Sequence, residues 1–444
     1  MRSALPKVLH PLLGRELVLW PVQAAQAAGA RQVVVVGGAD RALSGKLPAG
    51  VELGVQEEPL GTGDAVRSAE KWIGDQDTVV VLSGDVPLVS DELISALADE
   101  HEESGAAATM VTVELDDPTG YGRVVRDASG ALERVVETKA DGDAKPQELA
   151  IKEINTGIYA FTGAPLLEAL STLGADNAQG EYYLPEVLPS IRAAGGKVGT
   201  FTAQDPALVL GVNDLVDLAT VAAVAQRRIC DAHMRAGVTI LDPSRVLIEP
   251  SVQIGQDAVI SPGAALHGAT TVGSGSEIGP NTTLIDTTVG AGSKLIQTYS
   301  TEATVGDGCN VGPFAYLRPG AVLGDSSKVG TYVEIKNSTI GVGSKVPHLS
   351  YVGDTDIGES TNLGAGTITA NYDGVNKHRT MIGSNVHGGV DTSLVAPVTV
   401  GDNVWIAAGS VITEDVPDGA LAVARSRQTN IDDYNSRKHR ESKG

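Results

Sequence analysis

The stretch from Ile248 to Leu284 reads IEPSVQ IGQDAV ISPGAA LHGATT VGSGSE IGPNTT L. An aliphatic residue stands at every sixth position: Ile248, Ile254, Ile260, Leu266, Val272, Ile278 and Leu284. An α-helix would put residues six apart on different faces, because each residue turns the helix by about 100°. A period of six is instead typical of a parallel β-helix, in which each hexapeptide forms a short strand and a turn around an aliphatic core.

The same period continues towards the carboxyl end in two further registers. The phase shifts near Thr288, resumes in a second run and shifts again before a third. The second run is Val305, Val311, Leu317, Leu323, Val329 and Ile335. The third run is Ile382, Gly388, Leu394, Val400, Ile406 and Ile412. Just before the third run, the polar stretch 370–380 interrupts the period. We expect this stretch to leave the coil as a loop that carries part of a binding face.

The composition of the 444 residues narrows the class of protein. The net charge of −22 argues against nucleic acid as a partner, because nucleic-acid binding depends on a basic surface. No apolar run approaches the roughly 18 residues of a membrane span, so no membrane partner is expected. Cys230 and Cys309 lack metal-ligand or disulfide-framework spacing, which favours a cytoplasmic protein. The 53 glycines beside only 10 Tyr, 3 Phe and 3 Trp agree with a narrow aliphatic coil.

The amino-terminal half shows a different pattern, in which apolar strand-like runs alternate with helical stretches. The strand candidates are Gln32–Val36, Thr78–Leu82, Ala107–Val113 and Ile158–Phe161, and the helix candidates are Thr62–Trp72 and Ser90–Glu103. This alternation predicts a mostly parallel, Rossmann-like α/β sheet with helices on its faces.

A longer helix is predicted between the two halves. Asp214 is a suitable N-cap, apolar residues recur at spacings of three and four, and Gly237 supplies the stop. We therefore expect an α/β domain at 1–213, a linker helix at 214–236 and a β-helix domain at 237–444.

Two motifs of the first half suit a nucleotide and a metal ion. Gly61-Thr62-Gly63 precedes a helical stretch, where backbone N–H groups can face a base or a phosphate. Asp85 follows the strand Thr78–Leu82, at the end of the sheet where open α/β folds bind ligands, and its carboxylate suits Mg²⁺. Each motif alone is more often an ordinary turn, so the order of several motifs carries more weight than any one.

That order resembles the bacterial GlmU family of bifunctional enzymes, which are N-acetylglucosamine-1-phosphate uridyltransferases and glucosamine-1-phosphate N-acetyltransferases. The motifs are Leu5-Pro6-Lys7, Gly61-Thr62-Gly63, Gly84-Asp85-Val86-Pro87-Leu88, Tyr121-Gly122-Arg123, Ile154-Asn155-Thr156-Gly157 and Gly211-Val212-Asn213, followed by the hexapeptide coil. The resemblance implies acetyl transfer from acetyl-CoA to glucosamine 1-phosphate, then uridylyl transfer from UTP with release of pyrophosphate. It also implies a left-handed β-helix and a homotrimer.

For the uridyltransferase, the resemblance implies a set of nucleotide, sugar and metal ligands in the first half. Lys7 would bind phosphates, and Gln56, Gly61 and Thr62 would hold the uracil ring. The N-acetylglucosamine moiety would be held by Gly122, Glu137 and Asn155. Asp85 and Asn213 would ligate the catalytic Mg²⁺, Asn213 belonging to the nucleotide site as well.

For the acetyltransferase, the resemblance implies ligands spread over the coil and its inserted loop. His348 resembles the general base that accepts a proton from the substrate amine, chemistry that suits a histidine. Glucosamine 1-phosphate would be bound by Arg318, Lys336, Tyr351, Asn362 and Lys377. Acetyl-CoA would be bound around Ala365, Asn371, Tyr372, Val390, Ala408 and Arg425.

Two departures from the family pattern bear on these expectations. The opening Leu-x-x-Gly-x-Gly-Thr-x-Met signature is absent and Met1 aligns with its final Met, so a first strand and most of a phosphate-binding loop are expected to be missing. Val390 stands where the family pattern has Ser, which removes one hydroxyl near the acetyl group or the coenzyme.

Three alternatives stay open at this point. The chain could be an acetyltransferase only, its uridyltransferase impaired by the missing loop. It could be an assembly scaffold built on a degenerate nucleotide domain, although three cations and a histidine in the coil of an acidic protein speak against that. It could also be another sugar 1-phosphate nucleotidylyltransferase with a solenoid tail.

Overall fold

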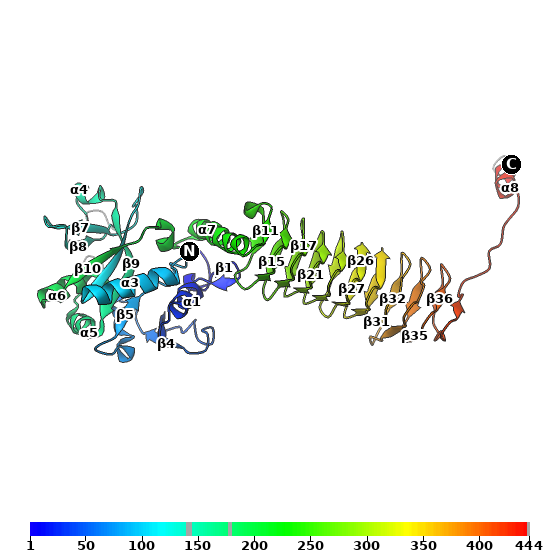
Figure 1. Cartoon of the computed structure of the whole chain (residues 1–444), viewed down its shortest axis with the longest axis horizontal. Coiled ribbons are helices and arrows are strands. Elements are labelled where there is room, and N and C mark those ends of the chain that lie inside the picture. Colours follow the sequence, from blue (N-terminus) through cyan, green and yellow to red (C-terminus); the bar gives the residue numbers. More distant parts are fainter. Residues whose placement is uncertain (139–143, 176–179, 442–444) are drawn as a thin grey trace. The chain divides into compact units, whose positions relative to one another are not determined.

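The computed structural model describes residues 1–138, 144–175 and 180–441. The chain forms two compact units, Met1–Ala225 and Gln226–Gly444, and the boundary between them in the sequence falls within one long helix. Each unit is described by itself below, and Figure 1 shows the α/β elements of the first and the stacked strands of the second.

The central sheet of the first unit is mixed, so the expectation of a mostly parallel sheet is wrong. Its strands run in the order β10 (Val198–Thr202), β6 (Ala108–Glu114), β9 (Glu153–Thr162), β7 (Arg123–Arg126) and β8 (Leu132–Val136), with β5 (Thr78–Val81) also paired to β9. Strand β9 is antiparallel to β5, β6 and β7. The β7–β8 hairpin reverses the direction of the chain, and the short helix α4 (Pro146–Leu149) lies between β8 and β9 in the sequence. A separate parallel pair joins β3 (Val33–Gly38) and β4 (Val51–Gln56).

Short helices cover this unit. They are α1 (Leu19–Ala27), α2 (Thr62–Arg67), α3 (Asp91–Ser104), α5 (Gly163–Thr172), α6 (Val187–Ala193) and the 3₁₀ turns η1 (Lys7–Leu9), η2 (Glu70–Trp72), η3 (Leu184–Glu186) and η4 (Pro206–Val209); β1 (Pro11–Leu12) and β2 (Arg15–Glu16) form a small hairpin. The predicted helix Thr62–Trp72 is broken into α2 and η2. The Ser68 hydroxyl donates to the Asp64 carbonyl at 3.0 Å, a local bond of the kind that bends helices.

Helix α7 (Leu215–Arg235) begins and ends as predicted. Asp214 Oδ1 accepts from the backbone N–H groups of Val216 and Asp217 at 2.7 and 2.9 Å, and Gly237 ends the helix with φ +95°. Its first half packs Val221 and Ala225 into the α/β unit, and Cys230 belongs to the core of the second unit.

The second unit is a parallel β-helix with three faces in its described part. Face I holds β11 (Thr239–Ile240), β14 (Val259–Ile260), β17 (Glu277–Ile278), β20 (Lys294–Leu295), β23 (Asn310–Val311), β26 (Lys328–Thr331) and β29 (Lys345–His348), and bridges through Asn362 and His387 continue it to β36 (Trp405–Ile406) and β38 (Leu421–Ala422). Face II holds β12 (Leu247–Ile248), β15 (Ala265–His267), β18 (Thr283–Ile285), β21 (Thr298–Thr301), β24 (Ala315–Leu317), β27 (Glu334–Lys336), β30 (Tyr351–Gly353), β32 (Ile368–Ala370), β34 (Ser393–Val395) and β37 (Val411–Ile412). Face III holds β13 (Gln253–Ile254), β16 (Thr271–Val272), β19 (Thr288–Val289), β22 (Thr304–Val305), β25 (Val322–Leu323), β28 (Thr339–Ile340), β31 (Thr355–Ile357), β33 (Thr380–Ile382) and β35 (Val398–Val400).

The period of six is confirmed as the spacing between inward-facing residues. One coil contains three hexapeptides, so Ile248 stacks on Leu266 and Leu266 on Leu284. The phase shift near Thr288 is a coil shortened by one residue, because Val272 stacks on Val289. Most of the inward aliphatic side chains are fully buried, and each contributes about 1.5–3 kcal/mol relative to an exposed one.

Buried hydroxyls join successive coils at a corner. Ser276 Oγ donates to the Gly290 carbonyl at 2.8 Å and accepts from the Ser293 N–H at 3.1 Å. Ser293 Oγ repeats this pattern one coil later with the Gly306 carbonyl and the Cys309 N–H. The small polar residues between the aliphatic ones therefore satisfy backbone groups that the coil buries.

The polar stretch 370–380 leaves the coil as predicted. It connects β32 on face II to β33 on face III, and the coil that contains it needs 25 residues to bring Ile357 beside Ile382. The loop is closed by a bridge between Tyr372 and Lys377 and by the His378 N–H, which donates to the Asn371 carbonyl at 2.8 Å.

No helix among the described residues combines the length and the apolar character that a membrane crossing requires.

Candidate active sites

Three residues of the first unit converge from distant parts of the sequence. Lys7 Nζ lies 2.5 Å from Asp85 Oδ2 and 3.2 Å from Asn213 Oδ1. Lys7 opens η1, Asp85 follows β5 at the carboxyl end of the strand, and Asn213 precedes α7. The Val212 N–H donates to the Asp85 carbonyl at 2.9 Å, which ties the last two loops together. We call Lys7, Asp85 and Asn213 the Lys7 cluster.

The oxygens of the Lys7 cluster suit a hard divalent cation. The Asp85 carboxylate and the Asn213 amide oxygen already share one cation, the Lys7 ammonium, and the side chains of Lys7 and Asp85 keep about a third of their surface exposed (32% and 29%). Among the described residues no group of His, Cys, Asp and Glu side chains could hold a metal ion by itself. Mg²⁺ commonly takes one or two protein oxygens and completes its shell with water and substrate phosphates, so the donor set fits that ion.

The Gly61-Thr62 turn is built around a close backbone approach. Gly61 has φ +115°, and a Cβ at this position would lie 2.6 Å from the Tyr182 carbonyl oxygen, so only glycine fits. Gln56, at the end of β4, donates through Nε2 to the Gly61 carbonyl at 3.1 Å and to Asp64 Oδ2 at 2.9 Å. Thr62 Oγ1 accepts from the Leu184 N–H at 3.0 Å. The structure thus brings together Gln56, Gly61 and Thr62.

The three expected sugar ligands of this unit also lie together. The Asn155 N–H donates to the Gly122 carbonyl at 2.9 Å, and a Cβ on Gly122 would lie 3.3 Å from Glu137 Oε1. Asn155 Oδ1 accepts from the Gly157 N–H and from Tyr159 Oη, at 3.1 and 2.8 Å. Complete burial raises the pKa of Tyr159, so its hydroxyl remains a donor that orients the Asn155 amide.

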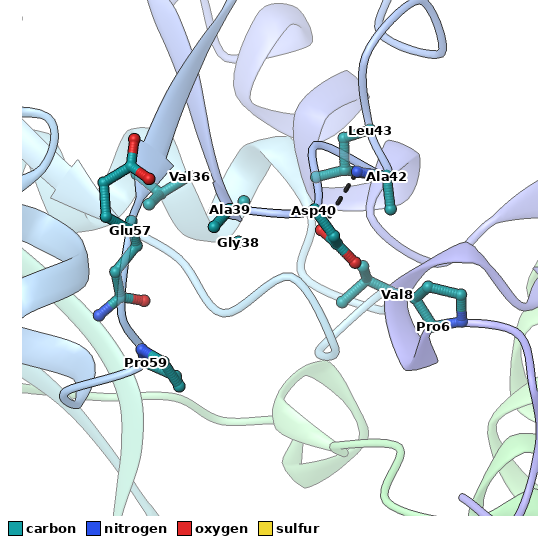
Figure 2. Close-up of a pocket in the computed structure, with 12 residues that line it drawn as sticks. Pro6, Val8, Val36, Gly38, Ala39, Asp40, Ala42, Leu43, Glu57 and Pro59 are labelled. Carbon is teal, nitrogen blue, oxygen red and sulfur yellow. Dashed lines mark hydrogen bonds between the residues drawn. The ribbon is translucent and has the colours of Figure 1, made fainter.

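A cavity of about 420 Å³ opens at the carboxyl ends of β3 and β4 (Figure 2). Its wall includes Gln56, Pro6 and Val8, the last two flanking Lys7, together with two carboxylates that the sequence analysis does not single out, Asp40 and Glu57. The cavity therefore joins the Gln56 side of the unit to the segment that carries Lys7.

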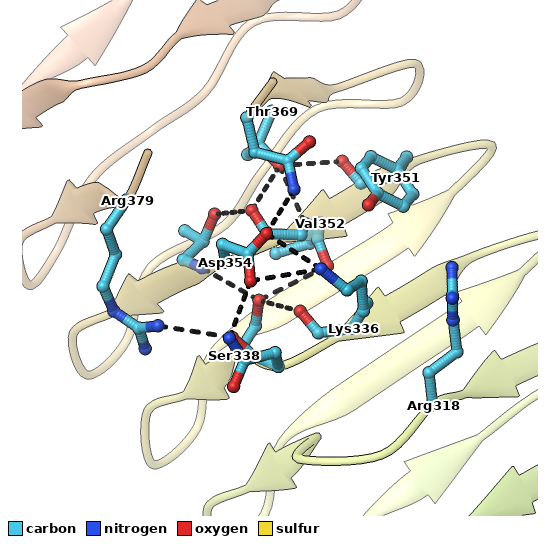
Figure 3. Close-up of polar contacts among 12 residues, drawn as sticks. Arg318, Lys336, Ser338, Tyr351, Val352, Asp354, Thr369 and Arg379 are labelled. Atoms are coloured by element: carbon cyan, nitrogen blue, oxygen red, sulfur yellow. Dashed lines mark hydrogen bonds and ion pairs between the residues drawn. The ribbon is translucent and has the colours of Figure 1, made fainter. Parts of the chain in front are cut away.

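In the second unit, the buried carboxylate of Asp354 contacts one of the expected sugar-phosphate ligands, Lys336 (Figure 3). Asp354 lies 3.0 Å from Lys336 Nζ and accepts from Asn337 Nδ2 at 2.6 Å and from Asn371 Nδ2. Burial is the largest influence on the pKa of Asp354 and raises it, but the three hydrogen bonds together hold it below its usual value. Burial likewise lowers the pKa of Lys336, and its interactions, led by the bond to Asp354, outweigh that and raise it. We call Lys336, Asn337, Asp354 and Asn371 the Asp354 cluster.

Face II presents further expected ligands around the Asp354 cluster. Tyr351 lies beside Glu334 in register and Gly353 beside Lys336, so Tyr351 and Lys336 occupy adjoining strands. The side chain of Lys377, in the inserted loop, lies close to that of Lys336. Arg318 pairs through Nη1 with Glu334 Oε1 at 2.8 Å. Three cations and a tyrosine thus line one surface, a combination suited to a phosphate monoester.

His348 ends β29 at the corner between faces I and II. Its backbone carbonyl accepts from the Gly366 N–H at 3.2 Å and from Ser350 Oγ at 2.7 Å, while its side chain is exposed. Tyr372 is also exposed, and its hydroxyl donates to the Gly374 carbonyl at 2.6 Å.

The remaining expected ligands lie away from the Asp354 cluster. Asn362 belongs to face I, where it bridges Lys345 and His387. The expected acetyl-CoA ligands outside the inserted loop lie on successive coils: Ala365, Val390, Ala408 and Arg425. The Asp391 N–H donates to the Ala365 carbonyl at 2.7 Å, and the Gly409 N–H donates to the Val390 carbonyl at 2.8 Å. One chain therefore carries the expected ligands on face II, on face I and at the corner between these two faces.

Comparison with known proteins covers both units. A nucleotidyl transferase family model matches residues 2–207, a bacterial transferase hexapeptide model of six repeats matches residues 302–337, and a model of the hexapeptide repeat of succinyl-transferase matches residues 379–414. The "Bifunctional protein GlmU" of Mycolicibacterium vanbaalenii is 49% identical over 450 residues, covering 99% of this chain and 90% of that protein. The protein of the same name from Streptomyces avermitilis is 48% identical over 445 residues, covering 99% and 92%.

The chain belongs to the GlmU family. Its α/β unit and its hexapeptide coil are the two halves that the resemblance predicts, and both are matched at this identity.

Sequence reasoning misses two residues of the GlmU-family chain that contact expected ligands, Asp354 and Tyr159. Asp354 stands at a corner of the coil with φ +51°, where aspartate and asparagine are common, so nothing in the sequence separates it from an ordinary corner residue. Tyr159 reads as an apolar strand residue. Its four-residue separation from Asn155 within β9 is the signal that could have linked the two.

Proposed function

We propose that this member of the GlmU family, a bifunctional enzyme of UDP-N-acetylglucosamine synthesis, acetylates glucosamine 1-phosphate in its β-helix and uridylylates the product in its α/β unit. The observation that carries the proposal is the 48–49% identity to proteins named bifunctional GlmU along nearly the whole chain. The two constellations described above agree with it, one around Lys7 and one around Asp354. We assign the first activity to residues 237–444, the second to residues 1–213, and residues 214–236 to the linker.

In the acetyl transfer, His348 accepts a proton from the substrate ammonium so that the nitrogen can attack the thioester carbonyl of acetyl-CoA. The attacking nitrogen releases its second proton to solvent, the C–S bond breaks, and the departing CoA sulfur takes the proton held by His348. Arg318, Lys336 and Lys377 bind the phosphate dianion, and Tyr351 and Asn362 complete the sugar site. Acetyl-CoA lies along Ala365, Asn371, Tyr372, Val390, Ala408 and Arg425, with the backbone of residue 390 replacing the hydroxyl that a serine would offer.

In the uridylyl transfer, a phosphate oxygen of N-acetylglucosamine 1-phosphate attacks the α-phosphorus of UTP, and the bond to pyrophosphate breaks. Gln56, Gly61 and Thr62 hold the uracil, and Gly122, Glu137 and Asn155 hold the sugar. Lys7 exchanges its bonds to Asp85 and Asn213 for phosphate oxygens and stabilises their charge. Asp85 and Asn213 would hold Mg²⁺, which neutralises phosphate charge when bound.

We further propose a cytoplasmic homotrimer with a left-handed coil. The division of the acetyltransferase ligands between two faces supports the trimer, because a neighbouring copy can bring one group opposite the other. Sedimentation of the full chain tests it, and a monomer at micromolar concentration would contradict it.

Matched variants test whether the two activities are separate. His348→Ala should abolish CoA release from acetyl-CoA with glucosamine 1-phosphate and leave pyrophosphate release from UTP with N-acetylglucosamine 1-phosphate intact. Asp85→Ala should do the reverse. Acetyl transfer without any uridylyl transfer by the parent chain would support the acetyltransferase-only alternative, and the absence of both would support a scaffold. If the chain turned over another nucleoside triphosphate or another sugar 1-phosphate faster than UTP and N-acetylglucosamine 1-phosphate, it would be a different nucleotidylyltransferase.

A further inference from the structure

An exposed pair of stacked aromatic rings lies near the carboxyl end of face I. His387 and Trp405 are neighbours in parallel register, with ring centroids 4.3 Å apart and an interplanar angle of 24°. Trp405 remains 60% exposed despite this contact, and its other register neighbour, Leu421, is 65% exposed. The pair therefore presents an open, flat aromatic face to solvent, as the stacked pair Phe314 and Tyr332 also does.

The pair continues the column that contains an expected substrate ligand. Asn362 is the register neighbour of His387 on the side opposite Trp405, so the outward side chains run Asn362, His387, Trp405, Leu421 along face I. Neighbouring strands are about 4.8 Å apart, a spacing close to that of stacked planar rings. The column therefore leads from the proposed acetyl-transfer site to a flat aromatic surface.

A cation lies against the turn that follows β36. The turn that follows Trp405 contains Ala408 and Gly409, and a Cβ on Gly409 would lie 3.9 Å from Cδ of Arg425. The Arg425 side chain thus crosses the turn, and it is exposed. A planar aromatic surface with a guanidinium against the adjoining turn suits a nucleotide, which combines an aromatic base with phosphates.

We infer that the His387–Trp405 pair binds the adenine ring of coenzyme A by stacking, with Arg425 on its phosphates. The inference rests on the proposed acetyltransferase function. It adds a binding surface for the adenosine end of acetyl-CoA, which is the end opposite to the thioester. Trp405 makes no contact with the reacting atoms in this arrangement, so it affects the binding of the donor and not the chemical step.

Removing the Trp405 indole should weaken the binding of acetyl donors that carry adenosine and leave the binding of donors without adenosine unchanged. Trp405→Thr in the full chain should raise KM for acetyl-CoA about tenfold at saturating glucosamine 1-phosphate, the size expected for one base-stacking contact. KM for acetyl-4′-phosphopantetheine, which has no adenosine, should not change. Trp405→Tyr should recover most of the loss, and Tyr299→Thr, which removes a 47% exposed tyrosine from face II, should behave as the parent.

A binding measurement keeps the inference separate from the activity. Adenosine 3′,5′-bisphosphate should quench the tryptophan fluorescence of the parent chain, and Trp405→Thr should lose that quenching while keeping the far-ultraviolet circular dichroism of the coil. If the parent chain fails to acetylate but shows this quenching, the proposed function fails and the nucleotide surface stands. An unchanged KM for acetyl-CoA in Trp405→Thr, or a change in sedimentation with no change in nucleotide binding, overturns the inference.

Discussion

Replacing Asp354 by asparagine should damage the β-helix and its sugar site together. The carboxylate accepts from Lys336, Asn337 and Asn371, and the asparagine amide keeps the shape while losing the charge and one acceptor oxygen. The side chains of Asp354 and Lys336 are only 10% and 17% exposed, so water cannot replace the lost partner of the ammonium.

The expected cost can be worked from this geometry. Hydrogen bonds to charged groups contribute about 1.5–3 kcal/mol each, and breaking a buried ion pair costs about 3–5 kcal/mol. Because 10% and 17% of the two side chains remain exposed and one acceptor oxygen is kept, we expect the lower end of the range for a broken buried pair. Asp354→Asn should therefore lose about 3 kcal/mol of unfolding free energy. Asp356→Asn is the matched control. Asp356 pairs with Arg379, and the two side chains are 33% and 42% exposed. Ion pairs this exposed contribute about 0–1 kcal/mol to the free energy of unfolding.

The effect should also depend on pH. The folded pKa of Asp354 is lowered, so its contribution is complete above the unfolded value near 3.9 and is lost as pH falls through the folded pKa. Urea unfolding of the coil, followed by circular dichroism at pH 7 and at pH 3, measures both quantities. Asp354→Asn should lose stability at pH 7 and lose less of it on acidification than the parent. A loss no larger than that of Asp356→Asn would refute the reasoning.

Three further predictions concern the two sites. Gly61→Ala should destabilise the α/β unit by more than about 2 kcal/mol in thermal unfolding, because the new Cβ would lie 2.6 Å from the Tyr182 carbonyl oxygen. Gly50→Ala is the control and should cost about 1 kcal/mol, because Gly50 has φ +82° but no atom within 4 Å of the new Cβ. Equal losses in the two variants would contradict the close approach at Gly61. His348→Ala should lower the kcat of acetyl transfer by about 10²–10⁴, as expected for a lost general base, with little change in KM for glucosamine 1-phosphate; a normal kcat would remove His348 from the mechanism. Lys7→Met should abolish uridylyl transfer and spare acetyl transfer, and removal of Mg²⁺ from the parent chain by EDTA should do the same. If EDTA also stopped CoA release, that result would argue against a metal restricted to the first unit.

The sequence predicts the coil well because its core follows one rule. Each inward position must be filled by an aliphatic residue, so Ile248, Leu266 and Leu284 reveal the stacking directly. The caps of α7 are equally local, since Asp214 and Gly237 act on the backbone next to them. The convergence of Lys7, Asp85 and Asn213 follows from motifs at the ends of strands and helices, which the fold brings to one edge.

What the sequence does not predict depends on register and direction over longer distances. Strand β9 runs antiparallel although its residues read like those of β6, because direction depends on the preceding connection. Asp354 reaches Lys336 only because the coil between them has a length of 17 residues, which aligns Lys336 with Gly353. The separation of Asn362 from Lys336 on two faces is likewise a consequence of coil length, and it is invisible in a set of family motifs.

A coupled assay of the full chain tests the central claim most directly. The chain is incubated with glucosamine 1-phosphate, acetyl-CoA, UTP and Mg²⁺, and CoA, pyrophosphate and UDP-N-acetylglucosamine are measured together. A single enzyme with both activities should release the three products in equal amounts once N-acetylglucosamine 1-phosphate has reached its steady level. Continued accumulation of N-acetylglucosamine 1-phosphate without pyrophosphate, or release of pyrophosphate without CoA, would contradict the claim that this chain carries out both reactions.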